Sequence, residues 1–104
     1  MFVRNVTIKL KANTAAEFGR LIENDILPVL RKQPGFRDEI SFVAPERWEA
    51  IAISFWETKE NCENYERTAY PELLKILASV VDGIPKVETL VLATSTLHKL
   101  AAKA

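Results

Sequence analysis

The order of strand-like and helix-like segments is the strongest constraint on how this chain can fold. Residues 2–11 (FVRNVTIKLK) alternate between two faces, which is the period of a β-strand. Apolar residues then recur at spacings of three and four from Phe18 to Leu30, which is typical of a helix with one apolar face. Thr14 and Glu17 have the spacing of a capping box, so we expect this helix to begin there.

The second half of the chain repeats this succession with one extra strand. Residues 36–44 (FRDEISFVA) and 49–57 (EAIAISFWE) predict two strands, and the short proline-led connection between them favours an antiparallel hairpin. A helical stretch follows over about 58–68, and Pro71 allows a new helical segment to start beside it. Residues 86–96 (KVETLVLATST) predict a fourth strand.

This order is the ferredoxin-like βαββαβ plan of the α+β class, in which helices cover one face of a four-stranded antiparallel sheet. At 104 residues the chain is long enough for one core and too short for two. We therefore expect a single domain over 1–104, with its core over about 2–96 and a tail over about 97–104. Pro28 lies inside the first helical stripe and predicts a kink or break near residues 24–27.

Composition argues against several classes of function. The 14 basic and 14 acidic side chains give a formal net charge of zero and form no basic cluster, so no nucleic-acid partner is expected. No apolar run reaches the roughly 18–20 residues that span a bilayer, so no membrane partner is expected either. Cys62 is the only cysteine, which fits a reducing compartment, and we expect a cytoplasmic protein. The single histidine and the scattered carboxylates show no metal-ligand spacing, so no metal site is expected.

The two faces of the predicted strand at 49–57 differ in size. Its smaller face, with three small residues beside Trp56, leaves room under the helices and predicts a cavity there. Asn5 and Thr7 of the first strand are the polar residues that we expect to face this cavity. The bulkier faces are expected to pack against a second copy of the chain. The cavity face of the third strand comprises Ala50, Ala52, Ser54 and Trp56, and the faces expected at the interface comprise Phe2, Val6, Ile8, Leu10, Ile51, Ile53 and Phe55.

Three passages, FVRNVTIKLK, LRKQPGFRDE and ISFWETKENCENY, carry a resemblance to a known family. In this order they resemble the antibiotic biosynthesis monooxygenase domain of the dimeric α+β barrel superfamily, over about residues 2–93. The resemblance implies a homodimer with a pocket in each subunit between sheet and helices. Some members of that family are cofactor-independent monooxygenases that act on electron-rich aromatic substrates, and others degrade haem.

The haem-degrading branch of this family uses an asparagine on the first strand, a tryptophan in the second helix and a histidine further along that helix. Asn5 matches the asparagine, Tyr65 lies where the tryptophan would be, and Lys75 lies near the position of the histidine. Without an imidazole there is no evident axial ligand for haem iron. We therefore expect neither haem nor any other cofactor.

We therefore predict a monooxygenase-like protein that holds a small aromatic substrate between sheet and helices, where oxygen reacts with a substrate carbanion. Asn5 would polarise a substrate oxygen, and Tyr65 or Tyr70 would supply a hydroxyl, which makes these three the predicted catalytic residues. The predicted substrate-binding residues are Trp56, Thr7 and Ser54.

Each of these residues also has a purely structural interpretation. Trp56 could fill the core, since burial of a tryptophan alone stabilises a fold by several kcal/mol. Cys62 has no nearby histidine in the sequence to activate it, and His98 lies in the predicted tail, so neither is favoured as a catalytic group. The rival hypothesis is a non-catalytic homodimer with a ligand-binding or structural role, and the absence of a well-placed base favours it.

Overall fold

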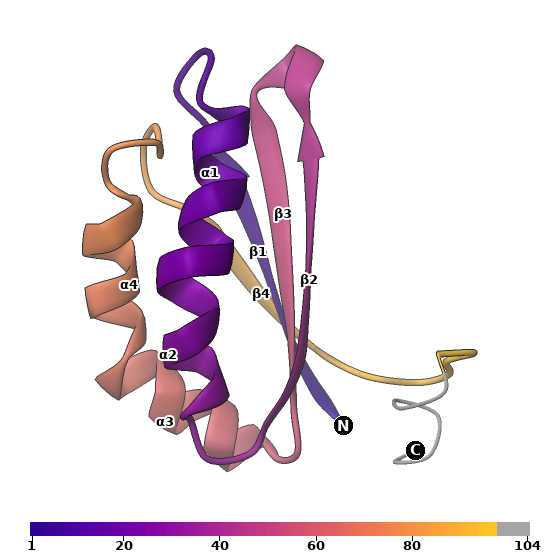
Figure 1. Ribbon diagram of the computed structural model, residues 1–104. Helices are drawn as coiled ribbons and strands as arrows, with labels where there is room; N and C mark the ends of the chain where they lie inside the picture. Colours follow the sequence, from indigo (N-terminus) through magenta and orange to yellow (C-terminus); the bar gives the residue numbers. More distant parts are fainter. Residues whose placement is uncertain (98–104) are drawn as a thin grey trace.

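A four-stranded antiparallel sheet forms one layer of the molecule and helices form the other (Figure 1). The structure is a computed structural model and describes residues 1–97, so His98 and most of the predicted tail lie outside the described residues. In chain order the elements are β1 (Phe2–Lys9), α1 (Ala15–Leu21), η1 (Ile22–Ile26), α2 (Leu27–Arg31), β2 (Phe36–Ala44), η2 (Pro45–Arg47), β3 (Glu49–Trp56), α3 (Lys59–Thr68), α4 (Tyr70–Leu77) and β4 (Lys86–Val91).

The sheet has the strand order β2-β3-β1-β4, and each neighbouring pair is antiparallel. This confirms the ferredoxin-like α+β prediction, including the hairpin between β2 and β3. The fourth strand ends at Val91 and not at residue 96. Among residues 1–97 no helix is both long enough and apolar enough to cross a membrane.

The two helical regions differ in how their N-termini are capped. The Thr58 hydroxyl accepts a hydrogen bond from the Asn61 backbone N–H at 3.1 Å, so Thr58 caps α3. The first helix begins at Ala15, next to the predicted cap, but the predicted capping box does not form. The Thr14 hydroxyl donates instead to the Lys11 carbonyl oxygen at 2.6 Å.

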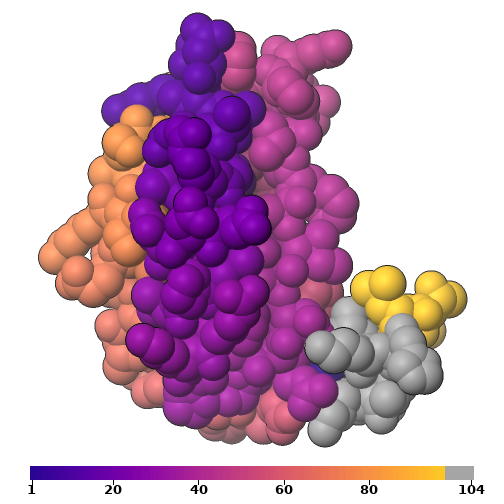
Figure 2. Space-filling view, viewed as in Figure 1, coloured from indigo at the N-terminus to yellow at the C-terminus, as the bar shows by residue number. Residues whose placement is uncertain are grey.

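The first helix is one continuous rod in which α1, η1 and α2 follow one another without a gap (Figure 1). The interruption predicted near residues 24–27 is present as the π-helical segment η1, and Pro28 lies in the first turn of α2. Pro28 has no N–H to bond a preceding carbonyl, so a change of winding before it is expected. Figure 2 shows this rod running along the face of the molecule, with α4 on one flank and β2 on the other.

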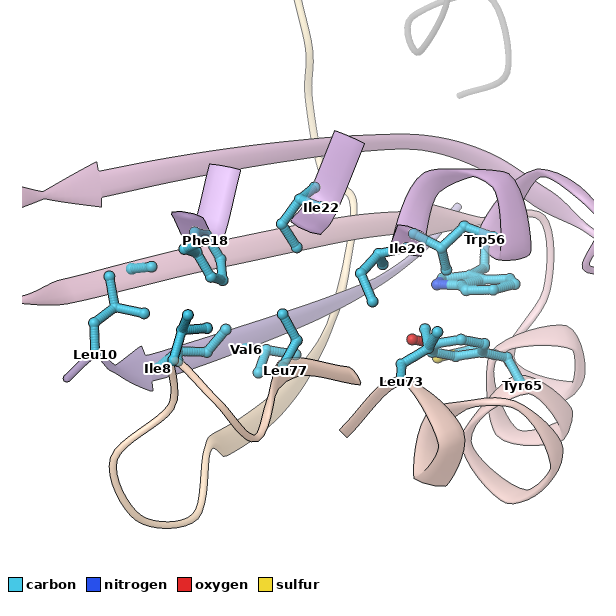
Figure 3. Close-up of a cluster of buried hydrophobic side chains, with 14 residues drawn as sticks. Val6, Ile8, Leu10, Phe18, Ile22, Ile26, Trp56, Tyr65, Leu73 and Leu77 are labelled. Carbon is cyan, nitrogen blue, oxygen red and sulfur yellow. The ribbon is translucent and has the colours of Figure 1, made fainter. Parts of the chain in front are cut away.

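The register between β1 and β3 decides which residues lie under the helices. Arg4 faces Ser54 and Val6 faces Ala52, and facing residues of an antiparallel pair project from the same side of the sheet. The small face of β3 therefore lies under the helices, as predicted. The bulky residues of β1 lie there too, buried against Phe18 and its neighbours, so their predicted place on the open face is wrong (Figure 3).

The open face of the sheet carries the other set of side chains. Val3, Asn5 and Thr7 of β1 lie there with Ile53 and its neighbours of β3. Val3 and Phe55 form a small second cluster, 7% exposed each, with Met1, Ile40, Ile53 and Leu92 packed against them. The open face of the sheet therefore carries an apolar cluster of its own.

A β-bulge between Phe36 and Asp38 sets the faces of β2. Phe36 pairs with Trp56, whereas Asp38 pairs with Phe55, so one extra residue is inserted in β2. Because side chains alternate along a strand, the inserted residue reverses the face of every later position. Glu39 consequently pairs with Ser54 on the helix side of the sheet.

Candidate functional site

A cavity lies between the helix side of the sheet and the helices that cover it. Its volume is about 50 Å³, which is small beside the roughly 300–1,000 Å³ of most small-molecule pockets. Isoleucine and leucine side chains from the first helix and from α4 form much of its apolar wall. The polar and aromatic residues that line it are Arg4, Glu39, Ser54, Tyr65 and Tyr70.

Trp56 supports this cavity from within the core. Its side chain is fully buried and its ring is stacked on Tyr65, with centroids 4.8 Å apart and an interplanar angle of 29° (Figure 3). Phe36 contacts the indole edge-on at 5.5 Å between ring centroids. The indole N–H donates to the Ser54 hydroxyl oxygen at 2.9 Å. Trp56 itself is not among the residues that line the cavity, so it fixes the positions of two residues that do.

Arg4 is a charged residue in the middle of this apolar layer, and it is only 2% exposed. Its Nε donates to Glu66 Oε2 at 3.2 Å, and its guanidinium carbon lies 3.9 Å from the centre of the Tyr70 ring. The centre of the Tyr65 ring lies 5.5 Å from the same guanidinium carbon. The Nη2 atom of Arg4 is buried and has no hydrogen-bond partner among the described residues.

Glu39 is the second charged residue of the cavity. It receives a hydrogen bond from the Ser41 hydroxyl. Burial raises the pKa of its carboxyl above the ordinary value, and the hydrogen bond from Ser41 offsets only part of this effect. Register places Glu39, Ser54 and Arg4 side by side across β2, β3 and β1. A carboxyl group and a guanidinium group therefore line one cavity, with a serine hydroxyl between them.

Burial also raises the pKa values of two other titratable groups in this region. It raises the pKa of the Tyr65 hydroxyl well above its usual range, although the positive charge of Arg4 acts in the opposite direction. Burial likewise raises the pKa of the Cys62 thiol to about 11. Tyr65 can therefore donate a hydrogen bond at neutral pH, whereas Cys62 is not a thiolate nucleophile there.

The structure brings together only part of the predicted site. Tyr65, Tyr70 and Ser54 line the same cavity, and Trp56 contacts two of these. Asn5 and Thr7 lie on the opposite side of the sheet, so the prediction that they face the cavity is wrong. They line a shallow surface groove with Lys86 and Glu88 of β4 instead.

Sequence reasoning missed Arg4 and Glu39. Arg4 interrupts an otherwise apolar row at every second position of the first strand, and a charged residue in such a row is a signal for a functional group in the core. Glu39 could be assigned to the helix side only with knowledge of the bulge, which the sequence did not reveal.

The residues around the cavity do not fit haem. Lys75, which lies near the position of the family's histidine, has a side chain that is 74% exposed and pairs with Glu72 at 3.2 Å. It therefore does not replace the axial histidine. Within residues 1–97 no group of three or more metal-ligating side chains lies together.

Solved structures share this fold. A monooxygenase from the gene ActVA-Orf6 of Streptomyces coelicolor, solved in complex with nanaomycin D, has a TM-score of 0.77 and 21% identity over 92% of this chain and 90% of that one. A candidate antibiotic biosynthesis monooxygenase from Bordetella bronchiseptica has a TM-score of 0.74 and 14% identity over 89% and 98% of the two chains. No protein-family model matches the sequence, and no curated protein sequence matches it.

The chain therefore has the fold of the antibiotic biosynthesis monooxygenase domain proteins, as the sequence resemblance predicted. At 21% identity or less, this likeness establishes the fold and leaves activity to be argued from the cavity.

Proposed function

We propose that this protein is a monooxygenase-like enzyme that binds a small phenolic aromatic molecule in the cavity and uses molecular oxygen as the oxidant. The observation that carries the proposal is the lining of the cavity, where a guanidinium, a carboxyl group and two tyrosines interrupt apolar walls. Apolar walls with a few convergent polar groups are the usual composition of a small-molecule site. The shared fold with a monooxygenase that was solved in complex with nanaomycin D supports the same assignment.

The proposed reaction needs no reductant beyond the substrate. Loss of the phenolic proton makes the ring carbon opposite the oxygen nucleophilic, and this carbon forms a bond to O₂. The resulting hydroperoxide breaks its O–O bond and loses water, which leaves a quinone. One oxygen atom stays on the ring and the other leaves in water, and the substrate supplies both hydrogens of that water and all four electrons that O₂ accepts.

In this proposal Glu39 accepts the phenolic proton. A carboxylate whose pKa is raised by burial is a stronger base than an exposed one, which suits it to this step. Tyr65 and Tyr70 would place neutral hydroxyl groups beside the substrate, in line with their predicted catalytic role. Asn5 takes no part, because its side chain lies on the other face of the sheet.

The test is oxygen consumption with a panel of phenols and 1-naphthols whose ring carbon opposite the hydroxyl carries a hydrogen, followed by mass spectrometry after reaction in ¹⁸O₂. We expect one labelled oxygen in the quinone product, and we expect Glu39→Gln to lower kcat about 100-fold or more, as loss of a general base does. Glu46→Gln is the matched control, because Glu46 is exposed in η2 and does not line the cavity. Equal rates for the two variants would contradict the role of Glu39, and binding without oxygen uptake would favour the non-catalytic alternative.

We further propose that two copies of the chain pack through the open faces of their sheets. The apolar cluster around Val3 and Phe55, together with the exposed Phe42 and Leu90, supports this face as the interface. A twofold axis would let the same face serve both subunits. Light scattering that gave the mass of one chain at micromolar concentration would contradict the dimer.

A further inference from the structure

Arg4 has more hydrogen-bond donors than the protein satisfies. A guanidinium carries five N–H donors in a planar fork. Of these, Nε bonds Glu66, whereas Nη2 is buried without a partner among residues 1–97. A buried donor that carries charge and lacks a partner is costly, so such groups are rare unless a ligand completes them.

A purely structural role explains this arrangement less well. A structural arginine usually meets a carboxylate through two parallel N–H groups, but Glu66 accepts from Nε and its side chain is 46% exposed. Solvent screens the exposed partner of such an ion pair, so the pair stabilises the fold only weakly. Tyr70 covers the flat face of the guanidinium at 3.9 Å and leaves the N–H groups at its edge available.

The surroundings of Arg4 define the chemistry of the missing acceptor. The titratable groups around Arg4 are Tyr65, Tyr70 and Glu39, which line the cavity with it, and Cys62 and Glu66 from α3, which lie outside the cavity lining. Burial raises the pKa values of Glu39, Tyr65 and Cys62, and Glu66 is the carboxylate that accepts a hydrogen bond from the positively charged guanidinium. An additional negative oxygen is therefore favoured there. The neighbouring rings of Tyr65 and Tyr70 favour an aromatic carrier for it.

We propose that Arg4 anchors the ionised oxygen of an aromatic ligand through Nη2, so that the cavity binds phenolates in preference to the corresponding phenols. This inference rests on the site of the proposed function and specifies its substrate class. Arg4 would act as a binding residue that also holds the substrate in the form that reacts with oxygen.

The test uses 4-nitrophenol as a probe, because its ionised form alone is yellow and its titration can be followed by absorbance. In the wild-type protein we expect the bound probe to ionise at a pH lower by about 1–3 than the free probe, as an adjacent opposite charge does. At a pH where the free probe is half ionised, 4-nitroanisole, which cannot ionise, should bind at least about fivefold more weakly.

Arg4→Met should abolish the shift in the titration of the probe, whereas Arg4→Lys should keep part of it. Arg67→Met is the matched control, because it removes an exposed guanidinium from α3, the helix that carries Glu66, and should leave the shift intact. Circular dichroism identifies any variant that fails to fold. The comparison of 4-nitrophenol with 4-nitroanisole on the wild-type protein decides the question in that case.

A bound probe that ionises at the same pH as the free probe, or at a higher pH, would overturn the proposal. Equal affinity for the two probes, or no binding of 4-nitrophenol at millimolar concentration, would also overturn it. None of these measurements requires turnover. A shifted titration without oxygen uptake would therefore contradict the proposed monooxygenase activity alone, and oxygen uptake without a shift would contradict the role of Arg4 alone.

Discussion

At the scale of single residues, the hydrogen bond between Ser54 and Trp56 gives the indole N–H of the largest core side chain its acceptor. The indole N–H has the Ser54 hydroxyl as its acceptor at 2.9 Å, and both residues are buried. Ser54→Ala should lower the free energy of unfolding by about 1–3 kcal/mol, because it leaves a buried donor without a partner. Urea denaturation measures this loss. Ser79→Ala, at an exposed position, should change stability by less than about 0.5 kcal/mol, and an equal effect of the two substitutions would contradict the importance of the bond.

The raised pKa of Glu39 makes the stability of the folded protein depend on pH, in a direction that follows from the shift. Burial raises the pKa of its carboxyl above 4.5 in the folded state, so over the pH range just above 4.5 the folded chain binds more protons than the unfolded chain. The contribution of Glu39 to stability is therefore full below this range and is lost as pH rises through the folded-state pKa.

Glu39→Gln should remove this fall in stability and make the protein more stable than wild type at neutral pH. The amide oxygen can still accept the Ser41 hydrogen bond. The free energy of unfolding, followed by urea denaturation from about pH 4 to 8, measures the effect. Glu46→Gln should keep the wild-type pH dependence, since Glu46 is exposed. A wild-type slope in Glu39→Gln would show that Glu39 is not the group responsible.

At the scale of elements, the π-helical segment η1 keeps one stripe of side chains on the sheet. Four buried residues of the first helix are spaced exclusively by four: Phe18, Ile22, Ile26 and Leu30. In an α-helix each such step rotates the side chain by about 40°, so the stripe would drift away from the sheet. The wider π turn takes up part of this rotation.

Deletion of Asn24 should convert the π turn to an α turn and rotate Ile26 and Leu30 away from the core. Loss of burial for these two side chains should cost about 3–6 kcal/mol, or about 1.5–3 kcal/mol each. Asn24 is exposed, so Asn24→Ala should change stability by less than about 0.5 kcal/mol. Thermal unfolding of both variants measures the difference. A deletion variant as stable as the substitution would mean that the stripe does not depend on η1.

Sequence reasoning predicted the secondary-structure elements and their order, but it did not predict how the faces of neighbouring strands match. Period-2 and period-3.6 patterns predicted the strands and helices and their order, because those periods follow from local backbone geometry. Alternation also assigned the small face of β3 correctly. It could not place Asn5, because a strand's own pattern does not say which of its faces matches a given face of its neighbour. The bulge that turns Glu39 toward the helices depends on pairing in the same way.

At the scale of the whole molecule, the proposed dimer makes a prediction about the open face. Phe42 is 56% exposed on that face, and a charge there would be buried without a partner in the interface. Phe42→Lys should shift the protein toward the monomer, as light scattering over a concentration series would show. Ile84→Lys is the control, because Ile84 is 94% exposed in the connection before β4 and should leave the dimer intact. A wild-type mass for Phe42→Lys at every concentration would place the interface elsewhere.

The small size of the cavity links ligand affinity to the internal motion of the molecule. At about 50 Å³ it admits an aromatic ring only when the helices stand further from the sheet. The apparent dissociation constant is then the intrinsic one divided by the fraction of molecules in that open state. Trimming a lining side chain such as Leu74 would weaken the packing and enlarge that fraction at the same time. The variant of this protein that binds most tightly would then be a less stable one than wild type.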